Sequence, residues 1–452
     1  MSVRGMRHSK FRHVFGTPNK AEFCYNNVKI TKSPFESNMC AVNSKFVAVV
    51  LEAQGGGAFL VINQENVGRV DLNHPKVCGH KSGVMDIQWN PFNEHQIASC
   101  SEDCKVMVWD IPEGGMTENI DTASVTLVGH ERKCAHLQWH PTASNVLASS
   151  AYDNVIIIWD TSVGESLITL DCFPDTISYF DWTYNGSFIA ATCKDKKLRV
   201  ISPRSGDVVA EGTCHLGNKP SKVVWCGKLG YLCTTGFTRT AERQIAVWDK
   251  GDLTKPLAQE SLDNASGVLF PFYDEGTSMV YITGKGDTNV RFFEVISEPP
   301  YLQFLNLYQS TVSQRGMGVL PKRCVDYKQC EVMRFYKLDN KGSVVPLVMT
   351  VPRKSVQFQK DLYPPAHAGE PSLTAGEWMS GQDCDPVMVE FTEDGLKKIA
   401  GGAKSSSATA KVKSSGATSK EPQTLEEFKK AYHLLQEENA QLKKELKQLK
   451  GQ

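Results

Sequence analysis

The residues best suited to chemistry in this sequence are a histidine, a serine and an aspartate in one short stretch, followed by a tryptophan. The same four residue types recur fifty positions later. Such a set can act in acid–base or nucleophilic catalysis, or it can form a hydrogen-bonded chain that stabilises the fold. The two sets are His80, Ser99, Asp103 and Trp109, and His130, Ser149, Asp153 and Trp159.

The landmarks around these sets favour the structural alternative. Both stretches begin with Gly-His, at Gly79 and Gly129, and both end with Trp-Asp. This pattern is typical of a WD-repeat blade of a β-propeller. In such a blade the aspartate lies in a tight turn, the histidine precedes it, and the serine and tryptophan come from neighbouring strands. We therefore predict a buried hydrogen-bonded chain in each blade and no catalytic role for the two histidines.

Weaker copies of the same landmarks continue along the chain. One includes Asp195, one runs from His215 to Asp249, and one carries Thr283, Asp287 and Phe293. Less regular strand patterns occupy 10–70 and 310–352. A single four-stranded blade cannot bury its own faces, so blades stack in a ring. We predict an all-β fold, a seven-bladed WD-repeat β-propeller over residues 1–352.

Closure of this ring requires that the two ends of the propeller share a blade, because pairing them removes the open sheet edges. The polar and apolar residues alternate from Lys10 to Phe15, as they do in a half-buried strand. We therefore expect the N-terminal strand that closes the ring to lie in this stretch.

The sequence after the propeller divides into three parts. Residues 353–395 contain several prolines together with Phe358, Tyr363 and Trp378, which favours an extension packed on the propeller. Residues 396–422 are rich in glycine, alanine, serine and lysine, and they predict a basic flexible linker. Residues 423–452 have a seven-residue apolar spacing, which predicts a short parallel coiled coil.

An isolated helix of this length is marginal, so the coiled-coil segment needs a partner. The alternative is that it packs back on the propeller, which the long linker disfavours. Asn439 at a core position favours a dimer over a trimer. The predicted oligomerisation residues are Leu425, Phe428, Tyr432, Leu435, Asn439, Leu442, Leu446 and Leu449.

Composition excludes little by itself. Fifty Lys and Arg residues balance fifty Asp and Glu residues, so net charge does not point to nucleic acid. The fourteen cysteines form no C-x-x-C pair, and no secretory signal is recognised, so reduced thiols in the cytoplasm are expected. No apolar run is long enough to span a membrane, which leaves peripheral membrane contact open. Metalloprotease, lipase-type and phosphate-loop motifs do not occur, and we expect neither an enzyme nor a cofactor.

Five further motifs are distinctive: Ser9–Gly16, Gly55–Val61, Ser101–Cys104, Arg315–Gly318 with Pro321–Arg323, and Met349–Ser355. They resemble the motifs of the coronin family. The order of parts also resembles that of a short, class I-type coronin. The resemblance implies a propeller that binds filamentous actin and a coiled coil that oligomerises and helps to engage the actin-related-protein nucleation complex. It further implies roles in actin filament organisation, cell motility and phagocytosis, and a location in the cytoplasm at the actin cytoskeleton of the cell cortex.

The basic N-terminal region is the predicted contact with actin. Coronins of this type often carry an arginine shortly after Cys-Tyr, where this chain has Lys29, which keeps the charge but not the bidentate fork. We predict that Arg12, Lys20 and Lys29 bind the acidic surface of the filament. A solvated strand face is the alternative for these residues. A generic WD-repeat scaffold for protein–protein interactions is the alternative for the whole chain.

Overall fold

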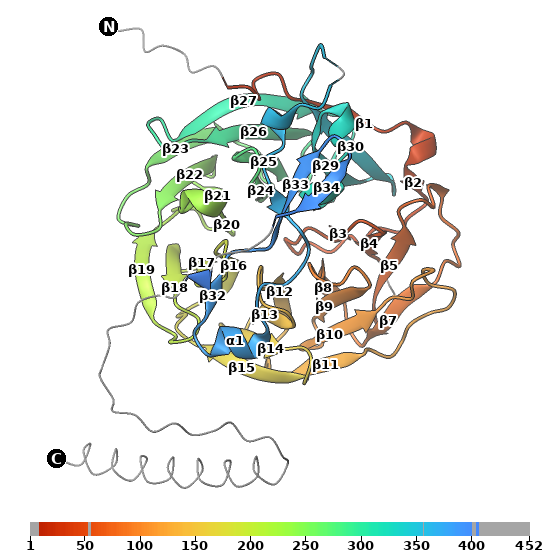
Figure 1. The fold of residues 1–452 in the computed structure, drawn as a ribbon. Coiled ribbons are helices and arrows are strands. Elements are labelled where there is room, and N and C mark those ends of the chain that lie inside the picture. The colour runs from red at the N-terminus through yellow and green to blue at the C-terminus, as the bar shows by residue number, and fades with distance from the viewer. Residues whose placement is uncertain (1–8, 53–55, 356, 400–403, 406–452) are drawn as a thin grey trace, which may run out of the picture. The chain divides into compact units, whose positions relative to one another are not determined.

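The computed structural model describes residues 9–52, 56–355, 357–399 and 404–405. Within them, seven mainly antiparallel sheets follow one another around a ring, and each sheet forms one blade (Figure 1). This arrangement confirms the predicted seven-bladed β-propeller. The predicted coiled-coil residues, Leu425 to Leu449, lie outside the described residues.

Six blades consist of four strands each; in blades 2 to 6 these follow one another directly in the chain, and in blade 1 the short strand β6 of another sheet intervenes. Blade 1 is β3 (Cys40–Val42), β4 (Phe46–Val50), β5 (Gly57–Asn63) and β7 (Lys76–His80); blade 2 is β8 (Val84–Trp89), β9 (Gln96–Ser101), β10 (Lys105–Asp110) and β11 (Val125–Val128); blade 3 is β12 (Cys134–Trp139), β13 (Val146–Ala151), β14 (Ile156–Asp160) and β15 (Glu165–Leu170). Blade 4 is β16 (Ile177–Trp182), β17 (Ile189–Cys193), β18 (Lys197–Ile201) and β19 (Val208–Thr213); blade 5 is β20 (Lys222–Trp225), β21 (Tyr231–Phe237), β22 (Arg243–Asp249) and β23 (Ala258–Asp263); blade 6 is β24 (Leu269–Asp274), β25 (Met279–Gly284), β26 (Asn289–Val295) and β27 (Leu302–Gln309).

Blade 7 is built from both ends of the propeller. Its strands β28 (Gln314–Val319), β29 (Glu331–Asp339) and β30 (Val344–Thr350) are completed by β1 (Phe15–Pro18), which pairs antiparallel with β30. The short strands β2 (Tyr25–Asn26) and β6 (Gly68–Arg69) extend the same sheet. The N-terminal strand β1 therefore closes the ring.

The exact stretch predicted for this strand was wrong in part. Residues 10–13 form a turn, with Arg12 N bonded to Ser9 O and Val14 N bonded to Phe11 O, and the strand begins only at Phe15. Phe11 and Val14 are both buried in the core between blades 6 and 7, whereas Phe15 is half exposed. The apolar residues thus anchor a tight turn, and their alternation in the sequence reflects that anchoring rather than a pleated strand.

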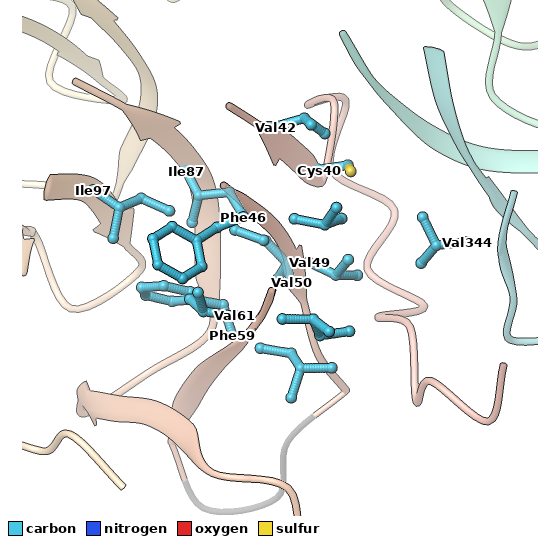
Figure 2. Close-up of a cluster of buried hydrophobic side chains, with 14 of the residues drawn as sticks. Cys40, Val42, Phe46, Val49, Val50, Phe59, Val61, Ile87, Ile97 and Val344 are labelled. Atoms are coloured by element: carbon cyan, nitrogen blue, oxygen red, sulfur yellow. The ribbon is translucent and has the colours of Figure 1, made fainter. Parts of the chain in front are cut away.

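Apolar side chains fill the spaces between successive blades. Figure 2 shows one such cluster, in which Phe46 of β4 lies beside Ile87 of β8, whereas Val49 lies on the side of β4 that faces Val344 of β30. Because these side chains are almost completely removed from water, each contributes about 1.5–3 kcal/mol of hydrophobic free energy. The blades are therefore held by their neighbours, which explains why the repeat must close into a ring.

The segment after the propeller lies across one face of it (Figure 1). Its elements are a 3-10 helix at Lys360–Leu362, β31 (Ala366–His367), α1 (Ala375–Met379), β32 (Asp383–Cys384), β33 (Met388–Thr392), β34 (Gly395–Lys398) and β35 (Lys404–Ser405). Within the described part of the propeller, further short 3-10 helices occur at Ala21–Phe23, Gly227–Leu229, Lys322–Cys324 and Tyr327–Gln329. Thr374 and Glu377 form a reciprocal capping box at the start of α1. Trp378 is fully buried against His140 and Trp182.

The two faces of the propeller differ in what covers them. The extension contacts connections between the first and second strands of the blades, for example through the Ala143–Leu373 bridge and the bond from Trp378 Nε1 to Gly186 O. We call this side the covered face. The opposite side, the open face, carries the turns between second and third strands: 102–104, 152–155, 194–196, 285–288 and 340–343.

Candidate functional site

The first predicted set of polar residues forms a continuous hydrogen-bonded chain in blade 2, which His80 joins from the end of β7 in blade 1. His80 Nδ1 lies 3.0 Å from Asp103 Oδ2, and His80 Nε2 lies 2.8 Å from Ser99 Oγ. Trp109 Nε1 donates to the same Ser99 oxygen at 2.8 Å. Ser99 and Trp109 have no exposed surface. A substrate cannot reach this serine, so the geometry fits a structural role.

Blade 3 repeats this geometry. His130 Nδ1 lies 2.9 Å from Asp153 Oδ2, and both His130 Nε2 and Trp159 Nε1 lie 2.8 Å from Ser149 Oγ. Burial alone would raise the pKa of Asp153, but the bond and charge of His130, with two backbone amides, lower it overall. The sequence repeat thus places the same four groups at the same positions in two blades.

Other blades satisfy the same positions with different side chains. In blade 5, His215 Nε2 and Trp248 Nε1 lie 2.9 and 2.8 Å from Thr234 Oγ1, and Gln244 accepts at the other histidine nitrogen. In blade 4, Asp195 pairs with the buried Arg199 instead of a histidine. Each substitution keeps a closed polar chain in the blade, as burial requires.

The link between blades 5 and 6 was not predicted from the sequence. Arg243 is 1% exposed, and its guanidinium pairs with Asp263 at 2.6 Å and with Asp287 at 2.8 Å. Arg291 of blade 6 contacts the same Asp263 carboxylate at 2.5 Å. Sequence inspection showed only extra residues at 239–243, because nothing in their spacing indicates which distant acids the arginine meets.

The three basic residues predicted to contact actin lie beside different parts of strand β30 in blade 7. Phe15 of β1 lies opposite Thr350, whereas Tyr25 of β2 lies opposite Val344, so these two residues are about 20 Å apart along β30. Arg12, just before β1, is therefore at the end of β30 that leads into the extension. There its neighbour Lys10 donates to the Asp361 carbonyl.

Lys29 lies at the opposite end of β30, on the open face. Val28 N donates to Gly342 O at 2.9 Å, which places Lys29 beside the turn that carries Lys341. Both lysines are exposed. Lys20 lies between the two ends, next to Asn19, whose amide bonds to Pro346 O. The structure therefore does not bring Arg12, Lys20 and Lys29 into one patch.

Sequence reasoning missed the lysines that do share the end of blade 7 with Lys29. Lys341 lies in the β29–β30 turn, and Lys32 pairs with Glu52 at 3.0 Å while remaining largely exposed. The signal for Lys341 was present, since Asn340-Lys341-Gly342 interrupts two strand-like runs as a hairpin turn does. The backbone pairing that brings this turn next to Lys29 is a tertiary contact, which the sequence does not indicate.

Neither metal binding nor membrane insertion is indicated by the described part of the chain. Among these residues, no group of three or more His, Cys, Asp or Glu side chains is placed to hold a metal ion. No helix among them is long and apolar enough to cross a bilayer.

Family models match the first four blades of the propeller and the last strand of the chain in blade 7. Residues 4–69 match the domain of unknown function DUF1899. Residues 73–110, 122–160 and 164–202 match the WD domain, G-beta repeat, and residues 344–386 match a type of WD40 repeat. The first match includes the ring-closing strand, and the last includes β30 together with part of the extension.

Individual proteins match over nearly the whole described chain. Human Coronin-2B is 52% identical over 393 residues, which are 87% of this chain and 82% of that protein. Human Coronin-2A is 48% identical over 391 residues, which are 85% of this chain and 74% of that protein. The crystal structure of the WD40 domain from Toxoplasma gondii coronin superposes with a TM-score of 0.79 at 31% identity, over 83% of this chain and 97% of that domain. With a ring closed by its own first strand and relatives this similar over this length, the chain belongs to the coronin family.

Proposed function

We propose that this protein binds filamentous actin through the open face of the propeller and organises filaments at the cell cortex without catalysis. The observation that carries the proposal is the placement of Lys29 and Lys341 side by side on the face that the extension leaves uncovered. Family membership supplies the partner, and the exposed lysines supply the charge that an acidic filament surface would attract.

The remaining parts of the proposal concern the tail. We propose that residues 423–452 oligomerise the chain, with a dimer favoured over a trimer, and help to engage the actin-related-protein nucleation complex. Two propellers joined by a flexible linker would bind a filament more tightly than one and could bridge two filaments. These roles fit actin filament organisation, cell migration and phagocytosis in the cytoplasm.

Co-sedimentation of the full chain with actin filaments tests the open face. Lys29→Glu should weaken binding about tenfold, because it replaces an attractive charge by a repulsive one. Binding of the unmodified protein should fall as salt rises. Arg12→Glu is the matched control, since it reverses a charge at the other end of β30.

The opposite pattern would assign the filament to the covered face: loss of binding with Arg12→Glu and unchanged binding with Lys29→Glu. If the unmodified protein does not pellet with filaments at any salt concentration, the generic WD-repeat scaffold becomes the better description of the chain.

A further inference from the structure

A cavity of about 430 Å³ opens at the centre of the open face. Its lining comes from the turns between second and third strands of blades 2 to 4, from the segments that enter blades 3 to 5, and from residues 33–36, which precede blade 1. A volume of this size accommodates several side chains of a bound ligand. The filament contact proposed above does not use this cavity, because Lys29 and Lys341 are not among its lining residues.

Lysines dominate the charge around the cavity. Four of them line it, against two glutamates, Glu36 and Glu102. Lys194 is exposed, and Lys133 lies over the ring of Tyr152, with its ammonium 3.8 Å from Glu102. The four lysines are Lys133, Lys194, Lys196 and Lys219. The mouth therefore attracts a ligand that carries negative charge.

The deeper lining is apolar. Phe35, Met85 and Ile177 contribute to it, and the last two are nearly completely buried. An inorganic anion would gain nothing from these surfaces, whereas a large apolar side chain would displace water from them. The combination favours a ligand with both an apolar anchor and flanking acids.

Two buried polar atoms in the lining, Glu36 Oε2 and His136 Nδ1, have no hydrogen-bond partner among the described residues. His136 is 3% exposed, packs against Phe35 and Tyr179, and has no hydrogen-bond partner at Nδ1 among the described residues. Burial, together with the charge of Lys222, holds the pKa of His136 well below its usual value, so the ring is neutral. An unpaired buried nitrogen is costly, and a ligand group or an ordered water that bonds to it recovers that cost.

The wall formed by residues 33–37 is fixed in place. Lys285 Nζ donates to the carbonyls of Ser33 and Phe35 at 2.5 and 3.0 Å, and Ser37 Oγ donates to Met85 O at 2.7 Å. Buried Lys222 donates to Glu36 O from the innermost strand of blade 5. A wall held by four such bonds is preorganised, which lowers the entropic cost of binding.

We propose that this cavity binds a peptide segment of a partner protein in which acidic residues flank a large apolar side chain. The apolar side chain enters between Phe35, Met85 and Ile177. The acids pair with the lysines at the mouth. This site lies on the same face as the proposed filament contact but uses different residues, so the two can be separated by mutation.

Selection of a random peptide library displayed on phage, against the full chain, tests this proposal. Peptides that combine aspartate or glutamate with leucine, phenylalanine or tryptophan should be enriched. A selected peptide should bind the double variant Lys194→Glu/Lys196→Glu about tenfold more weakly, by fluorescence anisotropy. Lys360→Glu, a charge reversal at an exposed site on the extension, is the matched control and should leave its affinity unchanged.

A second measurement locates the peptide. Hydrogen exchange should slow at residues 33–37 and 176–178 when the peptide is bound. An all-glutamate peptide of the same length should bind at least tenfold more weakly, because it lacks the anchor. The proposal is overturned by the absence of any enrichment, by selected peptides without acids, by equal binding to the double variant, or by equal binding of the all-glutamate peptide. Lys29→Glu should leave peptide affinity unchanged, which separates failure here from failure of the filament proposal.

Discussion

Trp139 of blade 3 donates its indole N–H to the carbonyl of Gln88 in blade 2, at 3.1 Å. The same bond recurs around the ring. Trp89 donates to Ala41 O, Trp182 to Gln138 O and Trp225 to Asp181 O, each from the end of an innermost strand to the innermost strand of the preceding blade. These bonds couple neighbouring blades in register, in addition to the apolar packing between them.

Removing one of these bonds should weaken the ring by a small and measurable amount. Trp139→Phe keeps an aromatic ring but loses the donor, and it leaves the Gln88 carbonyl without this partner. We expect the free energy of unfolding to fall by about 1–3 kcal/mol in denaturant titrations. Phe304→Leu, at an aromatic residue that is 49% exposed, is the control and should change stability little. Equal stability of Trp139→Phe and the unmodified protein would show that packing alone couples the blades.

The Asp103–His80 pair should make stability depend on acidity. Burial by itself would raise the pKa of Asp103, but the bond and charge of His80, with the amides of Lys81 and Lys105, lower it overall. Because the folded-state pKa lies below the unfolded value of about 3.9, the stabilisation is present above that pH and is lost as pH falls through the folded-state pKa.

Asp103→Asn should therefore reduce stability at neutral pH and flatten its decline below about pH 4, in thermal melts across a pH series. Asp207→Asn, at an exposed aspartate, should change neither the stability at neutral pH nor its decline in acid appreciably. A full acid-dependent decline in Asp103→Asn would show that other carboxylates govern acid unfolding.

Trp378 should determine whether the extension stays on the covered face. Its side chain is fully buried against His140 and Trp182, and its indole bonds to Gly186 O at 3.3 Å. Trp378→Ala should cost about 3–5 kcal/mol of packing and hydrogen bonding. Because the blades make their own contacts, limited proteolysis should then cleave within 366–399 while the propeller resists.

Met379→Ala is the matched control, since Met379 follows on the same helix but is 39% exposed. Equal resistance of Trp378→Ala and Met379→Ala to cleavage would contradict an anchoring role for the tryptophan.

The predicted coiled coil can be tested by measuring the molar mass of the protein in solution. Replacing Leu435 and Leu442 with glutamine should give monomers by light scattering, because both occupy the apolar seam of the sequence pattern. Replacing Gln441 and Gln448 with glutamate, away from the seam, should leave the oligomer intact. An oligomer that survives the leucine changes would place the contact elsewhere in the chain.

The repeats in the sequence were sufficient to predict the blades, but they did not predict the contacts between blades. The fifty-residue recurrence of His80 and Asp103 at His130 and Asp153 predicted a local arrangement, because all four groups of each set come from adjacent segments. The pairing of Arg243 with Asp263 and Asp287 joins two blades, and no fixed spacing in the sequence predicts it.

The same distinction applies to the candidate binding residues. Arg12 and Lys29 are close in sequence and of like charge, which suggested one patch. They lie at opposite ends of β30 because β1 and β2 pair with different parts of that strand. The prediction of strand at 10–15 failed for a related reason, since burial of Phe11 and Val14 in a turn leaves the same apolar pattern as a pleated strand.

Closure of blade 7 by β1 has a consequence for biosynthesis. The ribosome makes Phe15–Pro18 first, but their partner β30 emerges only after more than 300 further residues. At usual rates of translation that delay is roughly 15–65 s. During this delay β1 has no partner strand to pair with. The ring is still open, and the sheets at its two ends have unpaired edges. A cell that makes this protein must shield those edges until synthesis is nearly complete, so demand for chaperones is set by chain topology.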